Sequence, residues 1–235
     1  MKRERIQDQP AFLLHAIPYG ETSLVLDLLT RDHGRIAALA KGAKRPRSAL
    51  RAVLLQFQPL RVSYSGKAEL RTLTAAEWSG GLASPRGDAL LCAFYMNELM
   101  LKLLAREDSH PGLFAAYEQA LHALSENQAL DDTLRRFEWH LLGKPVMRPI
   151  WCVMQSNDRS LPGSRYAWLP EGGFVVCDVD QGGVSGEVLL SIASHDYLSE
   201  SSRQQAKALT RRILNHCLGG QDLNTRRILR DLQRR

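Results

Sequence analysis

The chain has 235 residues, of which 44% are hydrophobic, so it can bury a substantial core and form more than one small domain. Its 31 lysines and arginines exceed its 25 aspartates and glutamates, and the net charge of +6 favours an anionic partner such as nucleic acid or a membrane surface. The opening MKRERIQDQP lacks the apolar segment of a signal peptide, and the most apolar run is interrupted by Asn97, Glu98 and Lys102. We therefore expect a globular, cytoplasmic protein that does not insert into a membrane.

Residues 10–78 alternate between apolar and polar positions, which is typical of β-strands with one buried face. The apolar positions of the first three strands are Phe12, Leu14 and Ala16; Leu24, Leu26 and Leu28; and Ile36, Ala38 and Ala40. The segments PYGE, DHG and YSGKAE separate the strands and contain residues typical of turns. Five short strands favour a small barrel, because closing the sheet protects its edges. We predict this barrel over residues 1–80.

The predicted connection between the third and fourth strands is strongly basic. Its sequence, AKGAKRPRSALR at residues 40–51, contains five lysines and arginines and no carboxylate. Such a run is often only a solvated loop, but cations on flexible side chains also suit the phosphates of a nucleic acid. The pattern alone leaves both interpretations open.

A helical pattern replaces the strand pattern from residue 85, and we predict an all-helical domain over residues 85–145. Pro111 suits the first turn of one helix. The apolar face of this helix consists of Leu113, Phe114, Tyr117, Leu121 and Leu124. A second helix is expected from an N-cap at Asp131 to a stop at Gly143.

The remaining residues, 146–235, begin with irregular sequence and end in helices expected over residues 201–217 and 222–234. The last helix is amphipathic and basic, and its polar face could contact phosphate or simply be solvated. In the irregular part, Cys152 and Cys177 each begin a C-x-x-C-like spacing in which Gln155 and Asp180 replace the second cysteine. Since zinc requires four good donors, we expect a degenerate zinc-ribbon-like element without metal.

Signatures of catalysis are missing from the sequence. It contains no phosphate-binding loop of the G-x-x-x-x-G-K type, no G-x-G-x-x-G, no G-x-S-x-G and no H-E-x-x-H. Its seven histidines are dispersed, which argues against a metal cluster, and the clustered carboxylates of a nuclease are absent. We therefore expect a binding protein with no catalytic residue and no cofactor, and not an enzyme.

The segment YGETSLVLDLLTRDHGRIAALAKGAKRPRSALR, at residues 19–51, resembles the N-terminal domain of the RecO family of bacterial recombination mediators. The resemblance continues through ELRTLTAAE at 69–77, YMNELMLKLL at 95–104, LRRFEWHLLG at 134–143 and TRRIL at 225–229. It implies an α+β multidomain protein that begins with a five-stranded OB-fold β-barrel. A central all-α helical domain and a degenerate zinc-ribbon-like insertion would follow, with C-terminal helices packing on the helical domain.

The same resemblance implies binding to single- and double-stranded DNA, annealing of complementary strands, and cooperation with SSB and RecR in loading RecA. This is the recombinational repair pathway that also involves RecF, and such a protein acts at the nucleoid during repair. Backbone phosphates would contact cations of the basic segment and of neighbouring strands. The residues assigned to this role are Arg35, Lys41, Lys44, Arg45, Arg47, Arg51, Lys67 and Arg71. Tyr64 and Phe57 are either base-stacking platforms or core residues.

The resemblance also implies a pocket for the C-terminal tail of SSB in the helical region. We assign Arg135, Arg136 and Phe137 as candidates, because adjacent arginines on an amphipathic helix place one cation beside its apolar face. The alternative for that cation is an internal ion pair with Glu98 or Glu138.

Two other functions stay open for the barrel. An adaptor would use the same cations to bind an acidic peptide, because arginine pairs with carboxylates as well as with phosphates. An RNA-binding barrel of the translation apparatus would prefer structured RNA over DNA.

Overall fold

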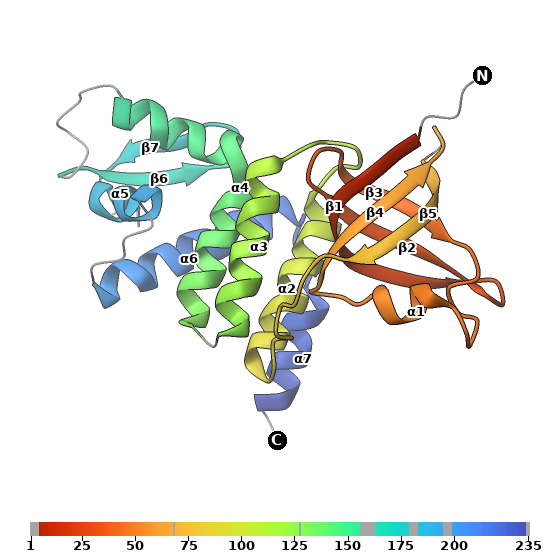
Figure 1. The fold of residues 1–235 in the computed structure, drawn as a ribbon. Coiled ribbons are helices and arrows are strands. Elements are labelled where there is room, and N and C mark those ends of the chain that lie inside the picture. The colour runs from red at the N-terminus through yellow and green to blue at the C-terminus, as the bar shows by residue number, and fades with distance from the viewer. Residues whose placement is uncertain are drawn as a thin grey trace. The chain divides into compact units, whose positions relative to one another are not determined.

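The computed structural model describes residues 5–67, 69–126, 128–155, 163–178, 183–194 and 199–233. The chain forms two compact units, which are Met1–Leu134 with Leu223–Arg235, and Arg135–Asp222. The first unit contains a barrel and helices, and the second a small sheet and helices, so the α+β class is confirmed (Figure 1). Among the described helices, none is both long enough and apolar enough to cross a membrane.

Five strands of the first unit close into a barrel in the order β1-β2-β3-β5-β4. Their bounds are β1 Arg5–Tyr19, β2 Ser23–Thr30, β3 Gly34–Ala40, β4 Pro59–Ser65 and β5 Leu70–Trp78. The β3–β5 pair is parallel and the other pairs are antiparallel. The long strand β1 pairs with β2 and with β4, which closes the sheet, and the short helix α1 (Ala49–Val53) lies between β3 and β4. The predicted five-stranded OB-fold barrel is confirmed.

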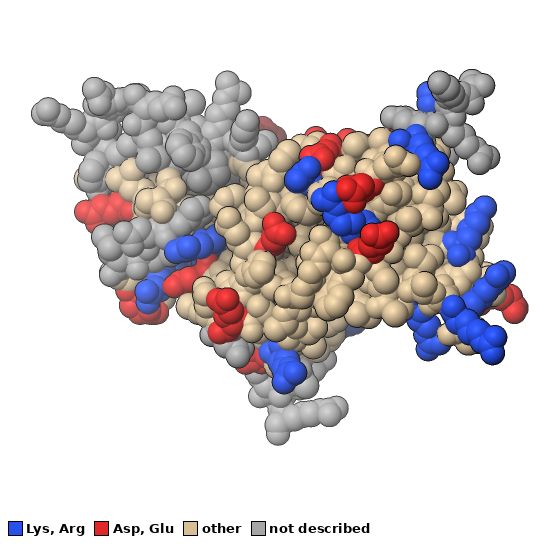
Figure 2. Space-filling model, in the orientation of Figure 1, with Lys and Arg blue, Asp and Glu red and all other residues tan. Residues whose placement is uncertain are grey.

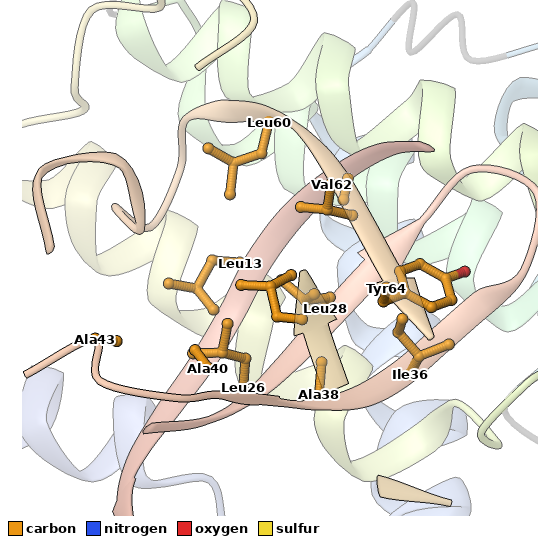
Figure 3. Packing of buried hydrophobic residues seen from close by; sticks show 12 residues of the cluster. Leu13, Leu26, Leu28, Ile36, Ala38, Ala40, Ala43, Leu60, Val62 and Tyr64 are labelled. Atoms are coloured by element: carbon orange, nitrogen blue, oxygen red, sulfur yellow. The ribbon is translucent and has the colours of Figure 1, made fainter. Parts of the chain in front are cut away.

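The interior of the barrel is apolar and is supplied by alternate residues of its strands (Figure 3). The predicted alternation is confirmed in β2 and β3, whose interior residues are Leu24, Leu26, Leu28, Ile36, Ala38 and Ala40. In β4 the interior residues are Leu60, Val62 and Tyr64. Buried side chains therefore fill the barrel, and a ligand of the barrel must bind outside it.

Strand β1 departs from the predicted alternation over residues 11–14, where both of its faces are buried. Phe12 and Leu14 lie in the strand and are buried, but they are outside the interior cluster, to which Ala11 and Leu13 belong. The ring of Phe12 packs 5.3 Å from that of Phe114 and 5.1 Å from that of Tyr117. A shift in pairing register between Leu13 and His15 then returns Ala16 to the interior.

Two helices that follow the barrel bury one face each. They are α2 (Asp88–Leu103) and α3 (Pro111–Ser125), and Pro111 lies in the first turn of α3 as predicted. The predicted apolar face of α3 is buried, and the Tyr117 hydroxyl donates to Asn97 Oδ1 at 2.6 Å. Asn97 Nδ2 donates in turn to the Leu14 carbonyl of β1 at 2.9 Å, which ties the barrel to α2 and α3.

The C-terminal helix α7 (Asn224–Gln233) packs against α2 within the first unit (Figure 1). The Glu98 carboxylate accepts hydrogen bonds from the backbone N–H groups of Asn224 and Thr225 at 2.8 and 2.9 Å. A carboxylate at a helix N-terminus satisfies free N–H groups and interacts favourably with the helix dipole. Glu98 therefore anchors α7 and does not pair with Arg135.

Helix α4 extends further than the sequence suggested. It runs over Leu130–Gln155 with a break at Gly143, where φ is 63° and ψ is −167°. The predicted interruption at Gly143 is thus present, but a second helical segment follows where irregular sequence was expected. Asp131 lies in the first turn and is not the N-cap, because the helix begins at Leu130.

The second unit contains a three-stranded sheet in the order β7-β6-β8 and two further helices. The elements are β6 Arg165–Leu169, β7 Gly173–Cys177, β8 Val184–Ser185, α5 Gly186–Ser194 and α6 Glu200–Cys217. Ser199 caps α6 by accepting from the Ser202 N–H at 3.1 Å. The core of the second unit is apolar. Its buried side chains include Tyr166, Trp168, Phe174, Val188, Leu189, Ile192, Leu209 and Ile213.

The degenerate zinc element falls mostly outside the described residues. Cys177 ends β7, but Asp180 and the side chains of Cys152 and Gln155 are not described. Within the described residues, no three histidine, cysteine, aspartate or glutamate side chains group as metal ligands would. Two thiols with a glutamine and an aspartate are a poor donor set for tetrahedral zinc, so no step of the function is assigned to a metal.

Candidate nucleic-acid-binding surface

The basic loop, residues 41–51, follows β3 and is held in place by contacts with the turn between β1 and β2. Ala43 is buried against the barrel interior. The backbone N–H of Lys44 donates to the Thr22 carbonyl at 2.8 Å, and that of Gly42 donates to Ser23 Oγ at 3.4 Å. The loop backbone is therefore fixed at one end of the barrel.

Five cations project from the basic loop, and all five are exposed: Lys41, Lys44, Arg45, Arg47 and Arg51. Lys44 Nζ lies 3.4 Å from the Gly20 carbonyl oxygen. Within the described residues, no carboxylate forms a salt bridge with any of the five. Figure 2 shows lysine and arginine side chains gathered at the barrel edge, on the right of the view. The basic loop thus presents positive charge that no carboxylate of the described residues pairs with.

Lys67 lies away from the basic loop. The parallel pairing of β3 with β5 aligns Leu70 with Ala37, so the turn before Leu70 lies toward the start of β3. The basic loop begins at the other end of β3, after Ala40. The barrel therefore separates Lys67 from the five loop cations.

Arg35 and Arg71, the remaining predicted contacts, are engaged inside the first unit. Arg35 Nη1 donates to the Leu101 carbonyl at 2.5 Å, and its partial burial lowers the pKa of the guanidinium. Arg71 pairs with Glu107 at 2.9 Å, and its guanidinium lies 5.3 Å from the centre of the Tyr64 ring. Arg35 thus joins the barrel to the last turn of α2, and Arg71 joins it to the segment that follows α2.

The linker between α2 and α3, residues 104–110, crosses the start of β3. The Glu107 N–H donates to the Arg35 carbonyl at 2.9 Å, and Arg106 Nη2 lies 3.4 Å from Asp27 Oδ1. Asp108 lies so close to Gly34 that a Cβ there would be 2.0 Å from the Asp108 carbonyl oxygen. The linker therefore covers one end of the outer face of β3, which the sequence did not indicate.

The two aromatic residues considered as stacking platforms are both core residues. Tyr64 is 1% exposed in the barrel interior, and Phe57 is 4% exposed with its ring 5.0 Å from that of Phe94. Sequence reasoning missed the exposed aromatic residue beside the basic loop, which is Tyr19. Its place at the end of β1, one residue before the turn that contacts the loop, is the signal that could have identified it.

Arg135 forms the internal ion pair that the sequence left open as an alternative. Its Nη2 donates to Glu138 Oε1 at 2.8 Å, and the two side chains are 11% and 0% exposed. Phe137 is buried, whereas Arg136 is exposed on the same helix. Of the three candidates for a peptide pocket, Arg136 is therefore the one that faces solvent.

Comparison with known proteins identifies the family. Residues 1–82 match the family described as Recombination protein O N terminal, and residues 85–227 match the family described as Recombination protein O C terminal. The chain belongs to the RecO family of DNA repair proteins. A DNA repair protein RecO of Polynucleobacter asymbioticus is 48% identical to it over 240 residues, which cover 98% of each chain.

Two further relatives carry the same name. The DNA repair protein RecO of Aromatoleum aromaticum is 46% identical over 237 residues, covering 99% of this chain and 98% of the relative. That of Burkholderia pseudomallei is 48% identical over 233 residues, covering 97% and 85%. Membership of the RecO family is consistent with a role in recombinational repair and with DNA binding.

Proposed function

We propose that this protein is a DNA-binding recombination mediator whose basic loop contacts the phosphates of single- and double-stranded DNA. It anneals complementary strands and, together with RecR, helps to load RecA onto single strands coated with SSB. The observation that carries the proposal is the exposure of five cations without a salt-bridged carboxylate on the OB-fold barrel of a RecO-family chain.

The physics of the basic loop favours binding that is independent of base sequence. Lysine and arginine side chains that meet phosphates release condensed counterions, and this release makes the affinity depend steeply on salt. Long side chains on an exposed loop position the strand by its backbone, which carries no direct sequence information. Such binding suits a mediator that acts on DNA of any sequence.

The loop contribution is tested by replacing Lys44, Arg45 and Arg47 with alanine together. Each lost phosphate contact lowers the slope of log affinity against log salt by about 0.7 for a single strand, so we expect a decrease of about 2. Binding to a mixed-sequence single strand is measured across a salt series. The loss should be similar for unrelated sequences.

A matched control removes three exposed arginines of α6: Arg203, Arg211 and Arg212. It changes the net charge equally but leaves the basic loop intact, so its slope should stay near that of the wild type. An unchanged slope in the loop variant would refute the phosphate contacts. Binding only to an acidic peptide, or a clear preference for structured RNA, would support the adaptor or the RNA-binding barrel instead.

The partnership with SSB rests on the exposed side of α4. Arg136 supplies a cation on an amphipathic helix, which suits the carboxylates of the acidic tail of SSB. Arg135 already neutralises Glu138, so it contributes to the fold of the second unit and not to the tail. Arg136 therefore replaces Arg135 as the first residue to test in the helical region.

A further inference from the structure

The outer face of β1, β2 and β3 carries a row of apolar side chains near the basic loop. Because Ala16, Leu24 and Ala40 pack against the barrel interior, the residues that alternate with them lie on the opposite face. The strand register aligns these outer residues, since Ile17 pairs with Val25 and Val25 pairs with Leu39. Tyr19 lies on the same face of β1, two residues closer to the turn. We call Ile17, Tyr19, Val25 and Leu39 the apolar strip.

Two of the four side chains of the apolar strip are exposed to solvent. Tyr19 is 57% exposed and Ile17 is 49% exposed, while Val25 and Leu39 are partly buried. Nearer the start of β1 the outer face is covered, because Phe12 packs against Phe114 and Tyr117 of α3. The apolar strip thus begins where α3 no longer covers β1. Adjacent apolar side chains that stay exposed mark binding surfaces.

The cations of the basic loop lie at the edge of the strip. Lys44 contacts both sides of the turn that follows Tyr19: its N–H donates to the Thr22 carbonyl and its Nζ lies near the Gly20 carbonyl. A nucleic acid strand whose phosphates meet the loop therefore has its bases within reach of the strip. Apolar and aromatic surface beside a positive groove is the usual combination in proteins that hold single strands.

We propose that the apolar strip is a platform for the unpaired bases of a single strand, with the Tyr19 ring stacking on one base. This inference rests on the proposed phosphate contacts of the basic loop. The bases of a duplex are paired and stacked on one another, so only a single strand can offer a free base face to Tyr19. The strip thereby gives a preference for single strands that phosphate contacts alone do not provide.

The test compares two probes that share phosphates but differ in bases. One is an oligothymidylate of about ten nucleotides, within the range that one OB fold covers, and the other is an abasic strand of the same length. The full-length protein should bind the oligothymidylate about fivefold more tightly or better, the lower limit for one stacked base. Tyr19→Ala should remove most of this difference, whereas Tyr19→Phe, which keeps the ring, should retain it.

The loop variant separates this inference from the proposed function. With Lys44, Arg45 and Arg47 replaced by alanine, both probes should bind more weakly while their ratio stays the same. Equal binding of both probes by the wild type, with a steep salt dependence, would overturn the platform and leave the loop contacts standing. Failure of the wild type to bind either probe would overturn both.

A second measurement needs no variant. It is photo-crosslinking: a single strand carrying 5-iododeoxyuridine is bound to the wild-type protein and irradiated. The protein residue that becomes crosslinked to the strand is then located by mass spectrometry. We expect attachment at Tyr19. Attachment confined to exposed aromatic residues elsewhere, such as Trp78, would refute the platform.

Discussion

Replacing Arg135 by alanine should destabilise the protein strongly, because it removes a cation that donates to the buried Glu138 carboxylate. The Glu138 side chain is 0% exposed, and Arg135 Nη2 donates to it at 2.8 Å from a side chain that is 11% exposed. Breaking a buried ion pair by removing one partner costs about 3–5 kcal/mol. For a chain of this size, that corresponds to a decrease in Tm of roughly 6–20 °C.

The assay is thermal and urea unfolding of the full chain, followed by circular dichroism. Arg136→Ala is the matched control, because it removes the neighbouring, exposed cation and should change the free energy of unfolding by less than about 1 kcal/mol. Replacing both members of the pair by apolar residues, Arg135→Met with Glu138→Leu, should recover most of the loss, since it removes the buried carboxylate together with its arginine.

Wild-type stability in Arg135→Ala would refute this reasoning about the pair and would restore Arg135 as a candidate for the SSB tail. If the expected loss is observed, weaker peptide binding by that variant reflects damage to the fold. The peptide surface must then be mapped through Arg136.

The remaining predictions concern two contacts of the first unit. Gly34→Ala should lower the free energy of unfolding by about 3 kcal/mol, because φ is 66° there and the new Cβ would meet the Asp108 backbone. The control is Gly20→Ala, where φ is 57° and the space is open, and it should lower the free energy of unfolding by only about 1 kcal/mol. Equal losses in the two variants, measured by urea unfolding, would argue against the close approach of the linker. Tyr117→Phe should cost about 1–2 kcal/mol, because it removes the buried donor to Asn97 Oδ1; an unchanged midpoint of denaturation would show that Asn97 finds another donor.

The strands of the barrel were predictable where one face is buried, and not where both are. In β2 and β3 the alternation of Leu26, Leu28, Ile36 and Ala38 marks the interior directly. Over residues 11–14, β1 is also buried on its outer side, where Phe12 packs against α3, so apolar residues occupy both faces there and the alternation no longer identifies the interior.

The helical segment after Gly143 was missed for a local reason. A glycine followed by a proline, here Gly143 and Pro145, favours the end of a helix, but proline is also tolerated in the first turn of a helix, where its missing N–H has no partner to lose. A glycine at positive φ followed by a proline therefore also fits a break between two helical segments.

The residues of the candidate site also differ in how much the sequence alone reveals about them. The cations of the basic loop could be identified from sequence because no carboxylate lies near them in the chain. The internal partners of Arg35 and Arg71 could not be foreseen, because Leu101 and Glu107 lie 66 and 36 residues away. Tyr64 was foreseeable as a core residue, since it alternates with Leu60 and Val62 in β4.

The linker after α2 also affects the part of the outer face that it leaves open. Asp27 lies on the outer face of β2, two residues from Val25 of the apolar strip, and an unpaired carboxylate there would repel a phosphate backbone. Arg106 of the linker lies 3.4 Å from this carboxylate, whose side chain is only 13% exposed, so the repulsion is largely neutralised. The same linker covers the start of β3 through Glu107 and Asp108. On the proposed function, the open surface for a strand is therefore the end of the barrel that carries both the basic loop and Tyr19.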